Sequence, residues 1–153
     1  DPKGWAAYDA ALGPEPLERE FSPARLRTIL AGSKASVKKV IMDQRAVVGV
    51  GNIYANEALF AAGIDPSKPA HLVAPAAADR LHGHIVRILE AAIRSQGTTV
   101  RDYRTGTGQK GGFQFSLLVY ERAGEPCRQC GTPLAGTHAI DARITVFCHR
   151  CQS

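Results

Sequence analysis

Four cysteines near the end of the chain carry the clearest chemical signal. They form two pairs, Cys127 with Cys130 and Cys148 with Cys151, in the spacing C-x2-C-x17-C-x2-C. Each pair can turn two sulfurs toward one ion, and two facing pairs complete a tetrahedron. We therefore expect one structural Zn²⁺ on four thiolates, stabilising a tail too short to bury a core of its own. Two disulfides are the alternative, but they belong to a secreted context for which the sequence gives no support.

A glycine-framed segment, Gly49–Asn52 (GVGN), offers a second kind of chemistry. Its two glycines allow a tight turn and leave the backbone uncovered by side chains. A helix is expected to begin here, so free backbone N–H groups and the positive end of the helix dipole would face outward. That arrangement suits a DNA phosphate, to which the Asn52 amide could donate, unless it caps the helix instead. An ordinary helix entry is the alternative interpretation.

The elements that position these groups are mainly helical. Apolar residues at helical spacing predict four helices, at about residues 23–31, 36–44, 52–62 and 75–95. Ser22 and Pro23 form a typical helix start, and glycines follow the predicted ends of three of the helices. In the second helix we expect Lys38 and Lys39 to lie nearer the solvent than their apolar neighbours.

Residues 104–112 contain four glycines and two bases, a composition that does not suit a packed element. We expect a mobile basic loop of the kind that closes over a ligand, with a plain linker as the alternative. The next segment, 113–120 (FQFSLLVY), is predicted to be a strand leading into the cysteine module.

Composition narrows the class of protein. The 153 residues are 44% hydrophobic and 22% charged, which is typical of a soluble globular chain. No apolar run approaches the roughly 18–20 residues of a membrane span, and no signal peptide is visible. The chain also lacks an initial Met, so we expect it to be a piece of a longer polypeptide.

Charge points to a polyanionic partner. The net charge is +5, but the first 20 residues carry −3 and the remainder +8. Residues 25–45 alone hold six bases and one acid. A basic body of this kind favours nucleic acid, although a solvated basic face is the plainer alternative.

Several motifs together resemble the formamidopyrimidine-DNA glycosylase family, bacterial base-excision repair enzymes that remove oxidised purines. They are the segments 43–60 (DQRAVVGVGNIYANEALF), 97–103 (GTTVRDY), 112–114 (GFQ), 124–131 (GEPCRQCG) and 147–152 (FCHRCQ). The motifs are independent of one another and occur in the order typical of the family.

The resemblance implies a mainly α fold with a small β zinc ribbon. A lead-in over 1–21 would precede a helix–two-turn–helix domain at 22–112 and a β-hairpin zinc finger at 113–153. The implied partner is double-stranded damaged DNA, bound by a monomer without membrane attachment. The implied location is the bacterial cytoplasm, in association with the nucleoid.

The resemblance also assigns roles to single residues. Asn52, preceded by Gly51, matches the family's phosphate-binding asparagine. Arg143 matches the arginine at the hairpin tip, which grips phosphates beside the extruded nucleotide and is credited with donating a proton in the second elimination step. Lys34 and Tyr120 align with DNA-contacting positions, although the Tyr120 ring could equally belong to the core.

The family's reaction needs residues that lie before the matched region. An amino-terminal proline forms the Schiff base and an adjacent glutamate acts as acid and base, both at the start of a β-sandwich domain. Here Pro2 lies between Asp1 and Lys3, and no such segment is recognised. We expect the parent protein to be a glycosylase and abasic-site lyase, and this chain alone to bind DNA without cutting it. The loop at 104–112 matches the family's lesion-capping loop.

Three other classes remain open on the sequence. One is an endonuclease-VIII-like glycosylase fragment for oxidised pyrimidines, and another is a non-enzymatic zinc-ribbon module that binds nucleic acid. The third is a zinc ribbon that binds proteins. Salt-dependent DNA binding separates the third class from the others, because counterion release gives a steep slope.

Overall fold

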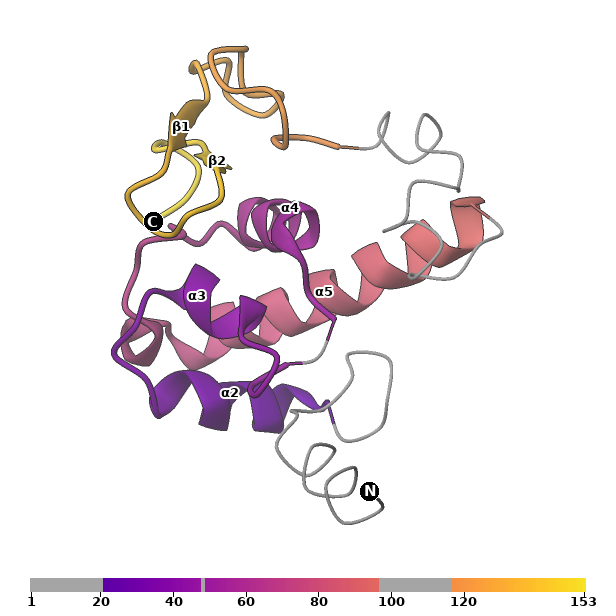
Figure 1. Ribbon diagram of the computed structural model, residues 1–153, viewed down its shortest axis with the longest axis vertical. Helices are drawn as coiled ribbons and strands as arrows, with labels where there is room; N and C mark the ends of the chain where they lie inside the picture. Colours follow the sequence, from indigo (N-terminus) through magenta and orange to yellow (C-terminus); the bar gives the residue numbers. More distant parts are fainter. Residues whose placement is uncertain (1–20, 48, 97–116) are drawn as a thin grey trace.

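The computed structural model describes residues 21–47, 49–96 and 117–153 (Figure 1). The elements are α2 (Pro23–Ala31), α3 (Val37–Met42), α4 (Asn52–Ala62), a 3-10 turn η1 (Ala70–Leu72), α5 (Pro75–Gln96), β1 (Ala135–Thr137) and β2 (Thr145–Phe147). Residues 1–20 of the predicted lead-in, the glycine-rich loop and the predicted domain boundary at 112/113 lie outside the described residues. Within the described part, no helix is both long and apolar enough to cross a membrane.

The helix boundaries follow from local capping, as the sequence predicts. The Ser22 Oγ accepts a hydrogen bond from the Arg25 N–H at 3.0 Å at the start of α2. At the end of α4, Gly63 adopts φ 74°, a left-handed conformation that favours glycine. These two helices and α5 agree with the predicted ranges to within a residue.

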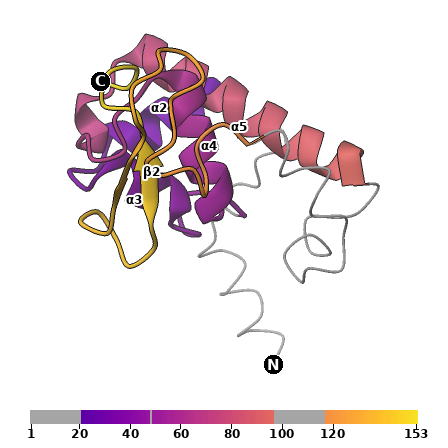
Figure 2. The same cartoon turned by 90° about the horizontal axis from the view of Figure 1, so that it is seen from above.

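One hydrophobic core joins the helices. Helix α5 packs against α2 and α4, and α3 packs on α4 (Figures 1 and 2). Fully buried side chains come from each of these helices and include Leu26, Leu30, Ile41, Leu59 and Leu81. The mainly helical fold class is therefore confirmed.

The C-terminal segment forms a small hairpin that rests on α4 (Figures 1 and 2). Strands β1 and β2 pair antiparallel, with Gly136 opposite Val146 in the middle of the register. A second apolar cluster fills the space between the hairpin and α4. Its buried members are Phe60, Val119, Cys127, Leu134, Val146 and Cys148. Because Phe60 belongs to α4, a helix of the helical part completes the core of the hairpin.

Two expectations about the second helix are wrong. Helix α3 ends at Met42 rather than near residue 44, because Asp43 turns to extended backbone and its carboxylate accepts the N–H of Arg45 at 2.9 Å. Lys38 is wholly buried rather than near solvent, whereas Lys39 is exposed as predicted. The Lys38 amine has polar partners on the hairpin that no local pattern reveals.

The predicted strand at 113–120 is also wrong over its described part, residues 117–120. The backbone N–H groups of Leu118, Val119 and Tyr120 donate to the Glu57 carboxylate of α4, at 2.7, 2.9 and 2.8 Å. Backbone N–H groups of a buried segment need hydrogen-bond acceptors, which a neighbouring strand usually supplies. Here the Glu57 carboxylate accepts from three successive N–H groups, so no neighbouring strand is required.

Candidate nucleic-acid interface and metal centre

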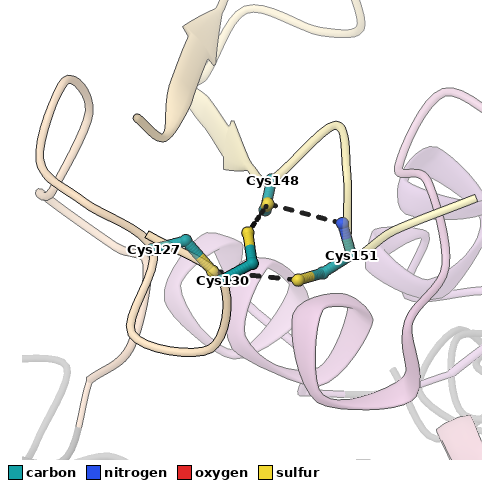
Figure 3. Close-up of side chains that lie close together, drawn as sticks. All are labelled: Cys127, Cys130, Cys148 and Cys151. Atoms are coloured by element: carbon teal, nitrogen blue, oxygen red, sulfur yellow. Dashed lines mark hydrogen bonds between the residues drawn. The ribbon is translucent and has the colours of Figure 1, made fainter. Parts of the chain in front are cut away.

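The four cysteines converge as predicted (Figure 3). Their sulfurs all lie within 4.8 Å of one another, with Cys130 and Cys148 at 3.5 Å and Cys127 and Cys151 at 3.9 Å. The cysteines are free, which excludes the two-disulfide alternative in this structure. Sulfurs about 2.3 Å from one zinc ion would form a tetrahedron with edges of about 3.8 Å. The donor set and its spacing therefore fit a single Zn²⁺.

Backbone hydrogen bonds shape the two cysteine pairs. The N–H groups of Gln129 and Cys151 point at the sulfurs of Cys127 and Cys148, each at 3.4 Å. Such N–H···S bonds orient thiolates and stabilise their charge.

The Gln152 side chain connects the second pair to the helices. Its Oε1 accepts the Cys148 N–H at 2.8 Å, and its Nε2 donates to the carbonyl of Ile64 at 2.9 Å. The cysteine cluster is thus tied to the segment that follows α4.

The thiols differ in acidity. Hydrogen bonds from Thr132 lower the pKa of Cys130 to about 6, whereas burial and neighbouring thiols raise the pKa of Cys151 to about 12. A cluster of this kind exchanges its remaining protons for a cation when metal binds, because the ligands are thiolates.

The start of α4 is open, as an anion site requires. Gly49 adopts φ 90°, so the tight turn uses the conformational freedom of glycine at this position. Gly51 is the N-cap with φ −90°, and a Cβ placed on it would meet no atom within 4 Å. The backbone conformation at position 51 therefore does not require glycine. Because Gly51 has no side chain, it leaves the start of α4 uncovered.

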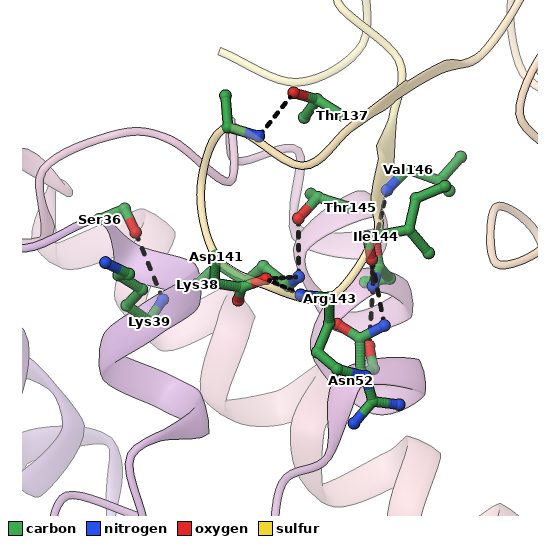
Figure 4. A network of polar contacts seen from close by, with 12 residues as sticks. Ser36, Lys38, Lys39, Asn52, Thr137, Asp141, Arg143, Ile144, Thr145 and Val146 are labelled. Atoms are coloured by element: carbon green, nitrogen blue, oxygen red, sulfur yellow. Dashed lines mark hydrogen bonds and ion pairs between the residues drawn. The ribbon is translucent and has the colours of Figure 1, made fainter.

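The Asn52 side chain joins the start of α4 to the hairpin rather than capping the helix. It makes no cap, because the N-cap is Gly51 and has no side-chain bond. Instead, the Asn52 Nδ2 donates to the carbonyl of Ile144 in the hairpin at 3.1 Å (Figure 4). The Asn52 Oδ1 is buried and has no hydrogen-bond partner in the part of the chain that the structure describes. The helix entrance is thus joined directly to the hairpin.

Asn56, one turn further along α4, strengthens the same junction. Its Oδ1 accepts the Val146 N–H of β2 at 2.7 Å, and its Nδ2 donates to the Asn52 carbonyl at 2.8 Å. Asn56 is not among the predicted site residues. The available signal was a second amide four residues after Asn52, which places both on one face of the helix.

Arg143 is exposed and lies directly before Ile144, so the Asn52 contact brings the helix entrance beside the predicted arginine. Figure 4 shows Asn52 and Arg143 within one polar network. Lys34 is exposed in the connection between α2 and α3. Tyr120 is half-buried against the helical core, which agrees with the core alternative for its ring.

A buried cation lies beneath the hairpin and was not predicted. The Lys38 Nζ donates to Thr145 Oγ1 at 2.7 Å and to Asp141 Oδ1 at 3.3 Å. Burial lowers the pKa of Lys38, Asp141 opposes that shift, and the nearby charge of Arg143 adds to it. Asp141 and Arg143 are therefore close to Lys38 as well as to each other.

A helical domain joined to a four-thiolate hairpin is the class of structure that these contacts define. The family model described as "Formamidopyrimidine-DNA glycosylase H2TH domain" matches residues 12–104, more than half of the chain. The chain therefore belongs to the formamidopyrimidine-DNA glycosylase family.

Curated relatives and solved structures agree with this assignment. Proteins named formamidopyrimidine-DNA glycosylase from Methylococcus capsulatus and Pseudomonas paraeruginosa are 50% and 52% identical over 143 and 141 residues. These alignments cover 94% and 92% of this chain and 52% of each relative, so the chain spans about half their length.

Among solved structures, Lactococcus lactis Fpg (MutM) in complex with a FAPY-dG containing DNA matches with a TM-score of 0.84 and 31% identity. That match covers 99% of this chain and 54% of the other. MutM (Fpg) from Thermus thermophilus matches with a TM-score of 0.81 and 35% identity, over 93% of this chain and 54% of that one.

Proposed function

We propose that this chain is the DNA-binding half of a base-excision-repair glycosylase and that it binds damaged double-stranded DNA. The observation that carries the proposal is the 3.1 Å bond from Asn52 to Ile144, which sets the open start of α4 beside the exposed Arg143. A helix N-terminus and a guanidinium on one surface can hold neighbouring phosphates of one strand. The relative from Lactococcus lactis, solved with damaged DNA, supports this choice of partner.

The roles of the DNA-contacting residues belong to the same proposal. Gly51 and Asn52 contact a phosphate at the helix entrance, and Arg143 grips the backbone at the hairpin. Lys34 and Tyr120 contribute at the margin of this surface. One Zn²⁺ on Cys127, Cys130, Cys148 and Cys151 holds the hairpin in place, a proposal supported by the spacing of the sulfurs.

The proposal for the parent protein follows from the family. It is a glycosylase and abasic-site lyase that removes oxidised purines, and the names of the relatives favour purines over oxidised pyrimidines. In that reaction Arg143 would donate the proton of the second elimination step. The enzyme would act as a monomer on the chromosome in the bacterial cytoplasm. The nucleophile comes from a domain preceding the matched region, so the chain alone binds DNA but does not cut it.

Binding and cleavage are tested with one labelled duplex. The zinc-loaded chain is titrated against a 20-base-pair duplex with a central 8-oxoguanine or abasic-site analogue, and anisotropy is recorded at several salt concentrations. We expect binding with a steep negative slope of log K against log salt. Salt-independent or absent binding contradicts the proposal, and strand scission by the chain alone contradicts the assignment of the nucleophile elsewhere.

A further inference from the structure

The lysine buried beneath the hairpin has a placement that the proposed function does not explain. The Lys38 side chain has 0% relative exposure, and its ammonium bridges α3 to two hairpin residues, Thr145 at 2.7 Å and Asp141 at 3.3 Å. Thr145 belongs to β2, whereas Asp141 lies in the connection that carries Arg143. One cation therefore holds the hairpin at two points, one on each side of the exposed arginine.

The Asp141 carboxylate transmits this contact to Arg143. The same oxygen that accepts from Lys38, Oδ1, also accepts the backbone N–H of Arg143 at 3.0 Å (Figure 4). A side-chain oxygen that binds the backbone two residues later closes a tight local turn. On the other side, the carbonyl of Ile144 accepts from Asn52. The backbone of Arg143 is therefore fixed on both sides, by α3 through Lys38 and by α4 through Asn52.

Stability alone does not account for a charge at this position. Taking the Lys38 ammonium wholly out of water, beside a carboxylate that stays 17% exposed, is costly. Replacing a buried ion pair by apolar groups of similar size is often neutral or stabilising. An apolar residue would suit α3, where Val37, Val40 and Ile41 are buried around Lys38. What the lysine adds is directional: it holds one carboxylate in one position. Preorganisation of this kind lowers the cost of ordering a long side chain on binding.

We propose that Lys38 is a positioning residue that, through Asp141, orients the turn bearing Arg143 so that its guanidinium is presented to the DNA backbone. This inference rests on the proposed function, because it takes Arg143 as the group that contacts phosphate. Lys38 itself does not touch the DNA, since its side chain is fully buried.

The test compares charge removal inside and outside the network. Lys38→Met removes the buried ammonium while keeping the volume, and Lys39→Met removes an equal charge from the exposed neighbouring position on the same helix. The zinc-loaded 153-residue chain is titrated with an abasic-site duplex at several salt concentrations. Urea unfolding of each variant is recorded in parallel.

We expect Arg143→Ala to weaken binding about tenfold and to lower the salt slope by about one phosphate contact. Lys38→Met is expected to reproduce most of that loss, about fivefold, in the folded protein. Its free energy of unfolding should fall as well, because the Asp141 carboxylate loses its cation. Lys39→Met should stay within about twofold of the parent, because only its long-range charge is lost. Lys38→Met should have no further effect in the Arg143→Ala background, since both changes remove the same contact.

A second variant covers the case in which Lys38→Met fails to fold. Lys38→Met combined with Asp141→Asn leaves no unpaired buried charge, and it is expected to fold and to bind as weakly as Arg143→Ala. If this double variant and Lys38→Met bind like the parent while Arg143→Ala does not, the positioning role is wrong and the proposed function stands. If Lys38→Met lowers the DNA affinity of the Arg143→Ala variant further, the positioning role is also wrong. If Arg143→Ala itself binds like the parent, the fault lies in the proposed function.

Discussion

Phe60 offers the sharpest test of how the two parts of the chain depend on each other. Its ring is 1% exposed, projects from α4, and fills the core of the hairpin beside Val146 and Cys148. Replacing it with Ala removes a buried ring from a site that lies between α4 on one side and the two cysteine pairs on the other. Phe→Ala changes at buried positions lower the free energy of unfolding by about 3–5 kcal/mol. Because the residues around Phe60 cannot move in to fill the cavity, we expect a loss of about 4 kcal/mol here.

The expected loss is a large share of the stability of a domain, which is typically about 5–15 kcal/mol. Because metal binding and hairpin packing are linked, the zinc affinity of Phe60→Ala should fall as well, by up to about a thousandfold. The free energy of unfolding comes from urea titration of the zinc-loaded chain, and zinc affinity from competition with a chromogenic chelator.

Leu72→Ala is the control, because Leu72 is 57% exposed and its truncation should change stability by less than about 0.5 kcal/mol. A loss below about 1 kcal/mol for Phe60→Ala would refute the shared core. So would an unchanged zinc affinity in a clearly destabilised variant, because the hairpin would then hold its metal without α4.

Three further predictions concern the start of α4, its junction with the hairpin, and the buried lysine of α3. Gly51→Ser should stabilise α4 by a few tenths of a kcal/mol in thermal unfolding, because Ser is the better N-cap, yet weaken duplex binding by covering the entrance; unchanged binding would contradict an open phosphate site. Asn56→Ala leaves the buried Val146 N–H without its partner and should cost about 3 kcal/mol in urea unfolding, whereas a cost below about 0.5 kcal/mol would contradict a tight junction. Burial lowers the pKa of Lys38 in the folded chain, so the unfolded chain holds the lysine proton more strongly. The free energy of unfolding of the parent should therefore rise with pH in the alkaline range just below the ordinary lysine pKa, and that of Lys38→Met should not show this rise. Parallel stability curves for these two chains would contradict that shift.

Local chemistry made the helices and the clustering of the four cysteines predictable. The Ser22 cap, the Gly63 stop and the cysteine spacing are each decided within a few residues, and all three appear as the sequence indicates. The helix entrance at Gly51 was likewise visible as a glycine-framed turn.

Contacts between distant segments were not predictable from local patterns. Lys38 and Lys39 are neighbouring lysines in one short helix, and the partners of the buried Lys38, Asp141 and Thr145, lie 103 and 107 residues away in the sequence. The apolar segment before the hairpin looks like a strand, but the Glu57 carboxylate takes the N–H groups that a neighbouring strand would have bound. In both cases a charged side chain supplies a partner that propensity and periodicity do not encode.

Amide chemical shifts on a ¹⁵N-labelled chain would show most directly whether the helix entrance and the hairpin turn meet one DNA strand. The zinc-loaded protein is titrated with a short duplex that carries an abasic-site analogue. We expect the amide signals of Gly51, Asn52 and Arg143 to move together, along one binding curve and with one dissociation constant. Shifts confined to the outer face of α5, or separate curves for α4 and the hairpin, would mean that these surfaces do not act as one site.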